Sequence, residues 1–286
     1  MEQNIGKLSE EVEKEIDPIF KKIDKICSKN SKKVLDAFQK CNLQEIHLNS
    51  STGYGIDEPG RNKIEEIYSN IFKAEDALVR TQLISGTHAL AVTLSALLRP
   101  QDTLLSITGS PYDTLQTVIG VSGNSKSSLK EYGIKYEQIE LIDSEFDTER
   151  IIKRLSKNDV KVVEIQRSRG YSTRKSLKIE QIEEIIKEIR KINKEVIIMV
   201  DNCYGEFVQE KEPIEVGADI AVRFINEKSR SRNCNFRSIY CRKKRFNRIM
   251  CRKINISRNR KRDRTIFKSK PITNKRTIFC TICCSK

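Results

Sequence analysis

Residues 160–201 read VKVVEIQRSRGYSTRKSLKIEQIEEIIKEIRKINKEVIIMVD. Residues 160–165 and 196–201 are short apolar runs typical of buried strands, and the isoleucine spacing over residues 179–192 is helical. A strand, a helix and a second strand in this order indicate a βαβ unit of a parallel sheet. In such a sheet ligands bind at the carboxyl ends of the strands, so residues that follow each strand are the candidates for function.

The same alternation extends upstream of this unit. Strands are expected at residues 78–84, 103–107 and 134–142, and helices at residues 62–73, 88–98, 112–120 and 148–156. Residues 7–29 and 31–41 also have helical spacing, with Pro18 as an interruption. The sequence therefore predicts an α/β fold, a mostly parallel sheet between helices, preceded by an N-terminal helical arm over residues 1–50.

The composition changes near residue 220. Residues 221–286 hold 22 Lys+Arg and 2 Asp+Glu, whereas residues 1–220 hold 32 and 37. The last 66 residues also contain six of the nine cysteines and none of the twelve glycines. We expect an incomplete large domain at residues 51–220 and a basic, disordered, non-native tail at residues 221–286.

Several classes of protein are disfavoured by the sequence. It has no run of about 18 apolar residues that could span a membrane, and its first residues lack the apolar region of a secretory signal. We therefore expect a cytoplasmic protein whose cysteines are free thiols or ligands and do not form a disulfide framework. No zinc-ligand spacing occurs, because the single C-x-x-C at Cys280 and Cys283 lacks a second pair.

Two motifs follow predicted strands. Ser85-Gly86-Thr87-His88 opens an apolar helix, where free N–H groups and the helix dipole suit a phosphate; the alternative is an ordinary helix cap with a packed histidine. Asp201 ends a buried strand, where an ionised carboxylate needs a cationic or donor partner; the alternative is a cap or turn aspartate.

Two further segments contain arginine. Residues 50–61 form a Gly-rich loop with Tyr54 and Arg61, which either reaches an anion on a neighbouring subunit or is a surface loop. Arg167 and Arg169 follow the strand at residues 160–165, a position that suits a carboxylate or phosphate. Two solvated arginines in a loop are an equal alternative.

Taken in order, these stretches resemble one family. GYGIDEPGR, EDALVRTQLISGTHAL, GSPYDTL, EIQRSRGYSTRKSL and VDNCYGEFVQEKEPIEVGAD are spread over residues 53–219. They resemble the methionine gamma-lyase-like group, also called aluminium resistance proteins, among the fold-type-I enzymes that depend on pyridoxal 5'-phosphate. The resemblance implies the large domain of the aspartate-aminotransferase fold, carbon–sulfur lyase-like chemistry on an amino acid such as methionine or cysteine, and a homo-oligomer.

The resemblance also implies roles for the candidate residues. Ser85, Gly86 and Thr87 would hold the cofactor phosphate, and Asp201 would pair with the pyridine nitrogen. The other implied residues are Tyr112 or His88 for stacking on the ring, Tyr54 and Arg61 for a partner's phosphate, and Arg167 or Arg169 for a substrate carboxylate.

The family's Schiff-base lysine has no counterpart at the expected place. In the family it follows the VGAD segment in a stretch like G-S-L-x-K-N-P-G, whereas this chain continues with AVRFINEKSR at residues 221–230. Degenerate codons for residues 223–230, moved by one base, can spell Gly-Ser-Leu-Met-Lys-Asn-Pro-Gly. Glycine codons displaced in this way become arginine codons, which matches the composition of the tail. We therefore expect a truncated, frameshifted and catalytically inactive chain, with Lys228 close to the lost position.

The alternative function is binding of nucleic acid or another polyanion. The segment CRKKR at residues 241–245 has aromatic residues interleaved nearby, as a stacking surface would. Binding through such a tail would be non-specific and sensitive to salt.

Overall fold

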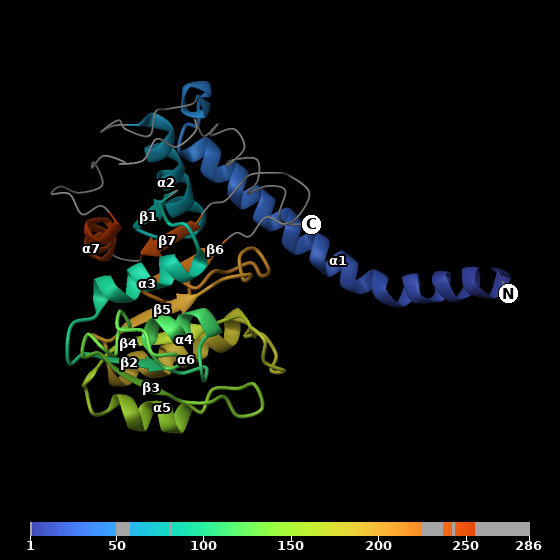
Figure 1. The fold of residues 1–286 in the computed structure, drawn as a ribbon. Helices are drawn as coiled ribbons and strands as arrows, with labels where there is room; N and C mark the ends of the chain where they lie inside the picture. The colour runs from blue at the N-terminus through green and yellow to red at the C-terminus, as the bar shows by residue number, and fades with distance from the viewer. Residues whose placement is uncertain (1, 50–57, 81, 225–236, 242–243, 255–286) are drawn as a thin grey trace.

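The computed structural model describes residues 2–49, 58–80, 82–224, 237–241 and 244–254, which build a seven-stranded sheet with helices on both faces (Figure 1). The strands are β1 (Asp76–Val79), β2 (Thr103–Ser106), β3 (Lys135–Gln138), β4 (Val160–Gln166), β5 (Ile197–Asp201), β6 (Ile220–Phe224) and β7 (Arg237–Cys241). Their order is β1-β7-β6-β5-β4-β2-β3. The five strands from β6 to β3 are parallel, and β7 runs antiparallel to both β6 and β1. The predicted α/β fold is confirmed.

Two apolar clusters attach the helices to the sheet. The helices are α1 (Glu2–Lys40), a 3-10 helix η1 (Glu45–Leu48), α2 (Pro59–Ile71), α3 (Gly86–Leu97), α4 (Asp113–Ile119), α5 (Thr148–Leu155), α6 (Ile179–Ile192) and α7 (Lys244–Ile254). Buried side chains of α2, α5, α6 and the end of α1 share one cluster. Those of α3, α4 and α7 share the other, on the opposite face. The sheet is therefore covered on both sides, as buried parallel strands require.

The βαβ unit at residues 160–201 forms as predicted. Its helix α6 buries Ile179, Ile182, Ile185, Ile186 and Ile189, which are spaced three or four residues apart and face the sheet. Every residue of β5 is buried, which explains its uninterrupted apolar sequence. Two upstream strands are shorter than expected, because β1 ends at Val79 and β3 ends at Gln138.

The N-terminal arm differs from the prediction at Pro18. The structure has one helix, α1, with Pro18 inside it. A proline removes one backbone hydrogen bond of the helix. The residues before and after Pro18 are nevertheless helical. The end of α1 packs in the core through Val34, Ala37 and Cys41. Figure 1 shows the N-terminal half extending away from the sheet.

The expectation of a disordered tail beginning at residue 221 is wrong for the tail residues that the structure describes. Strand β6 crosses the expected boundary, β7 fills the space between β6 and β1, and α7 packs against α3. Phe246, Met250 and Cys251 of α7 are buried. The prediction was based on the average composition of residues 221–286, which hides the few apolar residues that β6, β7 and α7 bury. The main-chain hydrogen bonds of a sheet also do not depend on the net charge of the segment.

Strand β6 also carries a buried arginine. The Nε of Arg223 lies 3.2 Å from the carboxylate of Glu206, and its guanidinium carbon lies 5.6 Å from the ring centroids of Tyr68 and Phe72. An ion pair and two aromatic faces therefore surround this charge.

Within the residues described, no helix is both long and apolar enough to cross a membrane. The described part of the chain also contains no cluster of three or more His, Cys, Asp or Glu side chains that could hold a metal ion.

Candidate functional site

The start of α3 lies just after β1, at the carboxyl edge of the sheet. Ser85 caps the helix, since its Oγ accepts a hydrogen bond from the His88 N–H at 2.9 Å. The His88 Nδ1 accepts from the Ile84 N–H at 3.3 Å, as the packed-histidine alternative expects. Ser85 and His88 thus serve the helix turn itself, and the N–H groups of Gly86 and Thr87 have no acceptor among the described residues.

Helix α4 begins beside α3. The Thr87 and Thr114 hydroxyl oxygens are 2.6 Å apart, which joins the first turns of the two helices. Tyr112 caps α4 and donates its backbone N–H to the Gln166 side chain at 2.7 Å. The start of α4 is therefore fixed to α3 and to the end of β4.

Tyr112 stacks on another tyrosine. Its ring centroid is 5.4 Å from that of Tyr171 with an interplanar angle of 28°, and the two hydroxyls are 3.2 Å apart. The hydrogen bond to Tyr171 is the main reason that the pKa of Tyr112 is raised to about 12. Tyr112 as a whole residue is 37% exposed, so part of it is accessible.

Asp201 ends β5 with a buried carboxyl group. Its Oδ1 accepts from the Cys203 N–H at 3.0 Å, and burial raises its pKa. No Lys, Arg or His side chain within the described residues forms an ion pair with it. A buried carboxylate without a cationic partner is unfavourable, so a ligand that supplies a donor at this position would be bound favourably.

The structure separates the two candidate arginines. Arg167 is 3% exposed, and its guanidinium donates to four protein groups: Leu177 O, Asn202 Oδ1, Gly205 O and Gln209 Oε1. Arg169 is exposed and lines a cavity. The protein occupies the donors of Arg167, whereas Arg169 is available to a ligand.

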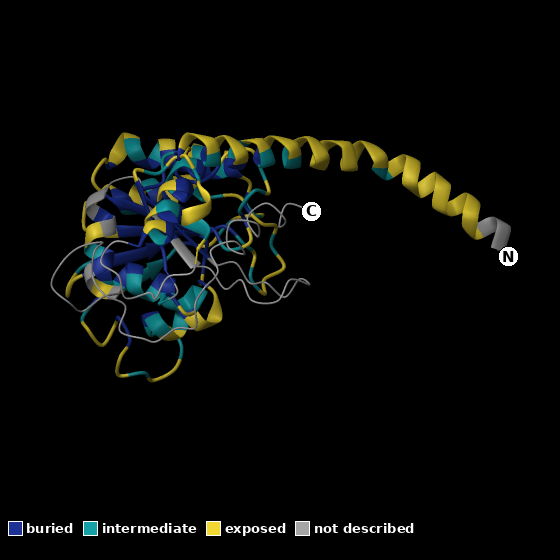
Figure 2. Cartoon of the chain, turned by 90° about the horizontal axis from the view of Figure 1, so that it is seen from above, coloured by how far each residue is buried: buried dark blue, intermediate teal, exposed yellow. Residues whose placement is uncertain are grey.

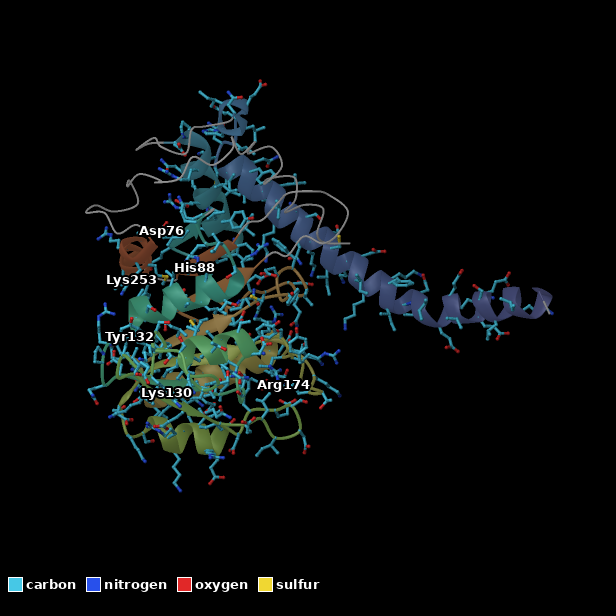
Figure 3. All side chains as sticks on the ribbon, in the orientation of Figure 1. Asp76, His88, Lys130, Tyr132, Arg174 and Lys253 are labelled. Atoms are coloured by element: carbon cyan, nitrogen blue, oxygen red, sulfur yellow. The ribbon has the colours of Figure 1, made fainter. Side chains whose placement is uncertain are left out.

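That cavity has a volume of about 400 Å³ and shares Tyr112 with the start of α4. Arg169, Tyr171, Arg174 and Glu140 contribute to its walls. Figure 3 labels Arg174 in the loop after β4 and His88 at the start of α3. The guanidinium of Arg174 donates to the carbonyl oxygens of Gln166, Ser168 and Lys175, so Arg169 is the side chain of this wall that suits a small anion such as a carboxylate.

Sequence reasoning missed Gln166, Tyr171 and Arg174. The loop after β4 places all three around Tyr112: Gln166 binds its backbone, Tyr171 stacks on its ring, and Arg174 lies in the wall of the cavity. They belong to the stretch QRSRGYSTR, in which only the first two arginines stood out. The polar side chains of a loop that follows a buried strand would have identified them.

Of the remaining two candidate residues, Tyr54 and Arg61, the structure describes only Arg61. Arg61 lies in the first turn of α2, with its Nη1 3.7 Å from the Glu58 carboxylate and little exposure. Tyr54 lies outside the described residues. Arg61 is therefore placed at a buried helix start, close to its own chain's Glu58.

The residues present fit pyridoxal 5'-phosphate. Asp201 offers a buried anion to a protonated ring nitrogen, the start of α3 offers N–H groups to a phosphate, and Tyr112 is an accessible aromatic residue. All three lie on the face of the sheet that α3 and α4 cover, or at its carboxyl edge.

Known proteins are similar to this chain over most of its length. The family model described as methionine gamma-lyase matches residues 5–228. The uncharacterized protein YnbB of Bacillus subtilis is 44% identical over 218 residues, which are 76% of this chain and 52% of YnbB. The chain thus spans about half the length of this curated relative.

Solved structures agree with the sequence match. A structure from Listeria monocytogenes is 38% identical with a TM-score of 0.89 and covers 96% of this chain and 67% of that one. A structure named a carbon-sulfur lyase involved in aluminum resistance, from Clostridium novyi NT, is 34% identical with a TM-score of 0.88 and covers 99% and 67%.

A more distant structure shares only the fold. The pyridoxal-5'-phosphate dependent protein YhfS from Escherichia coli is 18% identical with a TM-score of 0.59 and covers 80% of this chain and 58% of that one. The fold is therefore that of fold-type-I enzymes which depend on this cofactor. With its family match over residues 5–228 and its close structural relatives, the chain belongs to the methionine gamma-lyase family.

Proposed function

We propose that this chain contains the cofactor-binding domain of a lyase that depends on pyridoxal 5'-phosphate and acts on the carbon–sulfur bond of an amino acid. The observation that carries the proposal is Asp201, a fully buried carboxyl group at the carboxyl end of β5 with a raised pKa. Such a group is costly unless a ligand supplies a donor, and a protonated pyridine nitrogen is one.

The other residues of the site complete the binding. The first turn of α3, with Gly86 and Thr87, would hold the phosphate through its N–H groups and the helix dipole. Tyr112 would lie against the ring. When bound, the cofactor supplies an electron sink for negative charge at the α carbon of the substrate.

The substrate carboxylate would bind in the cavity beside Tyr112. Arg169 is exposed and lines that cavity, so it is a better candidate than Arg167 or Arg174, whose donors bind protein oxygens. A sulfur-containing amino acid of the methionine or cysteine class is the proposed substrate, by analogy with the family.

We also propose that the chain as written is catalytically inactive. The lysine that would attach the cofactor and move the α proton is expected between β6 and β7, and the residues there, 225–236, lie outside the described part of the chain. The sequence at this place is FINEKSR over residues 224–230 instead of the family pattern. A one-base shift of the reading frame accounts for the difference, although β6, β7 and α7 form on the sequence as it stands.

Titration of the full-length chain with pyridoxal 5'-phosphate tests the site. We expect saturable binding that Asp201→Asn weakens at least about tenfold, equivalent to the loss of one charge-assisted hydrogen bond. Asp24→Asn, on the exposed part of α1 and away from this site, is the control. Equal binding by wild type and Asp201→Asn contradicts the proposed site.

Borohydride reduction of the same mixture, followed by mass spectrometry of peptides, tests the inactivity. We expect no stoichiometric adduct on a single lysine and no thiol release from methionine or cysteine. A stable adduct on Lys228 together with thiol release contradicts this proposal and leaves the cofactor site in place.

A nucleotide read through codons 210–286 tests the frameshift. Codons that spell G-S-L-x-K-N-P-G in the neighbouring frame support it. Codons that cannot spell this motif in either neighbouring frame rule it out and make residues 221–286 an original part of the protein.

The basic tail supports one alternative function, binding of nucleic acid. Residues 221–286 carry 22 Lys+Arg against 2 Asp+Glu. Binding of this kind would weaken steeply with added salt and would disappear on removal of residues 221–286, which include CRKKR at residues 241–245.

A further inference from the structure

Tyr171 is an aromatic residue that lies outside both apolar clusters. Figure 2 shows buried strands inside the domain and exposed residues in the loops around them, and Tyr171 belongs to such a loop with an exposure of 83%. Within the described part of the chain, its ring contact and its side-chain hydrogen bond are both with Tyr112. An exposed side chain gains little from burial, so the contact with Tyr112 and the path of the loop determine where Tyr171 lies.

The loop after β4 turns directly against Tyr112. Gly170, the residue before Tyr171, has a φ of +57°, a left-handed conformation that glycine adopts without strain. A Cβ at this position would lie 3.3 Å from Gln166 Nε2 and 3.6 Å from Tyr112 Cδ2. Glycine therefore lets the backbone pass close to Tyr112 and place the next side chain on its ring.

Hydrogen bonds hold the loop in this path. Arg174 Nη2 donates to the carbonyl oxygen of Gln166 at 2.9 Å and to that of Ser168. The Gln166 side chain accepts the backbone N–H of Tyr112 at 2.7 Å and donates to the Ser168 carbonyl at 3.1 Å. One loop thus fixes the backbone of Tyr112 and carries the tyrosine that stacks on its ring.

The contact limits what the Tyr112 side chain can offer to a ligand. A ring has two faces, and since Tyr171 stacks on one of them, a planar ligand can stack only on the other. The Tyr112 hydroxyl donates its proton to the Tyr171 hydroxyl, so it can act toward a ligand as an acceptor. Loss of that proton would break the hydrogen bond, which is the main reason that the pKa of Tyr112 is raised to about 12. Asp113 and Tyr204 raise this pKa further.

We propose that Tyr171 is a positioning residue, whose stack and hydrogen bond hold the Tyr112 ring so that its opposite face is presented to the planar ring of the cofactor. This role rests on the proposed function, because it requires a cofactor ring beside Tyr112. Tyr171 acts through Tyr112 and lies on the face away from the cofactor. A ring that is already held in place loses less conformational freedom when the ligand binds, which favours binding.

Ionisation of Tyr112 in the cofactor-free chain tests the contact. Carbon-13 NMR of tyrosines labelled at Cζ follows each hydroxyl, and Tyr112→Phe assigns the signal. Tyr171→Phe keeps the ring and removes the hydroxyl, so the pKa of Tyr112 should fall from about 12 toward its ordinary value of 10. At pH 10 the wild-type Tyr112 should then be protonated, whereas about half of it should be ionised in Tyr171→Phe. Equal ionisation in the two chains overturns the proposal.

Binding of 4'-deoxypyridoxine 5'-phosphate tests the role toward the cofactor. This probe lacks the aldehyde, so its binding needs no lysine, and isothermal titration calorimetry measures the dissociation constant. Tyr171→Ala should raise that constant about three- to tenfold, the factor that one aromatic pair contributes. Tyr171→Phe keeps the stack and should retain most of the affinity. The control is Tyr132→Ala, at a 61% exposed tyrosine that Figure 3 shows on the side of the domain away from Arg174, and it should bind like the wild type.

The circular dichroism induced in the bound probe reports how its ring lies against Tyr112. We expect this signal to weaken in Tyr171→Ala and to persist in Tyr171→Phe, a difference that a general loss of stability would not produce. A signal that both variants lose to the same extent overturns positioning by the stack.

The remaining outcomes separate this role from the cofactor site itself. Equal dissociation constants in the wild type and Tyr171→Ala overturn the role of Tyr171 and leave the site in place. An equal loss in Tyr171→Ala and Tyr132→Ala overturns it too, because the effect is then not specific to this stack. If the wild-type chain does not bind the probe, the proposed function is wrong, and the role of Tyr171 toward a cofactor is wrong with it. Urea denaturation checks that the variants fold, since replacement of an exposed residue should change stability little.

Discussion

The guanidinium of Arg167 donates to Asn202 Oδ1 at 2.9 Å, and this hydrogen bond ties the loop after β4 to the loop after β5. The same guanidinium also reaches the Gly205 carbonyl at 2.7 Å. Asn202 in turn donates to the buried Glu212 carboxylate at 3.0 Å. A network of buried polar groups therefore holds the carboxyl end of the sheet on either side of Asp201.

Replacement of Arg167 should destabilise the fold. Arg167→Met leaves several buried acceptors without a donor, so we expect a loss of about 3 kcal/mol in the free energy of unfolding. Urea denaturation measures it. Arg169→Met, two residues away and exposed, is the control and should change stability by less than about 0.5 kcal/mol. Equal effects of the two substitutions would contradict the structural role of Arg167.

Gly205→Ala should also destabilise this network. A Cβ at this position would lie 2.7 Å from the Arg167 Nη1, which the surrounding hydrogen bonds hold in place. We expect a cost of about 2 kcal/mol, measured by thermal unfolding. Gly6→Ala is the control: a Cβ there meets nothing within 4 Å, and the exposed helix should gain up to about 1 kcal/mol.

Stability should depend on pH through Glu164. Burial raises the pKa of this carboxyl group from 4.5 to about 7. The folded chain therefore binds the proton more tightly than the unfolded chain, and the contribution to stability is complete below pH 4.5 and is lost as the pH rises to about 7. The loss is on the order of 3 kcal/mol.

Glu164→Gln checks this dependence. The amide keeps the hydrogen bond to the Ser106 hydroxyl, which lies 2.7 Å from the carboxyl oxygen, but it does not ionise. The variant should lose less stability between pH 5 and about 8 than the wild type does. Glu137→Gln is the opposite control, because Arg154 lowers the pKa of Glu137 and its stabilisation is lost as the pH falls. If the free energy of unfolding of Glu164→Gln falls with rising pH as steeply as that of the wild type, this explanation is wrong.

Helix α7 should contribute to stability although it belongs to the basic tail. Met250 is fully buried and its sulfur lies 3.8 Å from the Thr93 hydroxyl of α3. Met250→Ala should cost between about 2 and 5 kcal/mol. Arg248→Ala, on the exposed side of the same helix, should cost little. A Met250→Ala variant as stable as the wild type would mean that α7 does not pack on α3 in solution.

The sequence predicted the parallel part of the sheet because the spacing of apolar residues there matches the residues that the fold buries. The isoleucine spacing over residues 179–192 indicates a helix, and the apolar run at residues 197–200 indicates a buried strand. The pattern failed at β7 and α7, where a few buried residues lie among many charged ones. Only the position of β7 between β6 and β1 shows why Ile239 is buried, and that position is a tertiary contact.

The candidate site was predictable to a similar extent. Asp201 ends β5, and the α3 start follows β1 after a short loop, so their location at the sheet edge could be inferred. Arg167 and Arg169 could not be distinguished from sequence, because both follow β4 and only packing shows that Arg167 is buried. Tyr171 lies five residues beyond β4, and its contact with Tyr112 depends on the path of the loop.

The placement of β7 has a consequence for synthesis on the ribosome. Among the described strands, β1 pairs with β7 alone, yet residues 76–79 and residues 237–241 are far apart in the chain. Until the later segment emerges, the backbone groups of β1 have no strand partner and are free to pair with another nascent chain. Translation arrest between these two segments should therefore yield aggregation-prone, chaperone-bound chains, and arrest well beyond residue 254 should not.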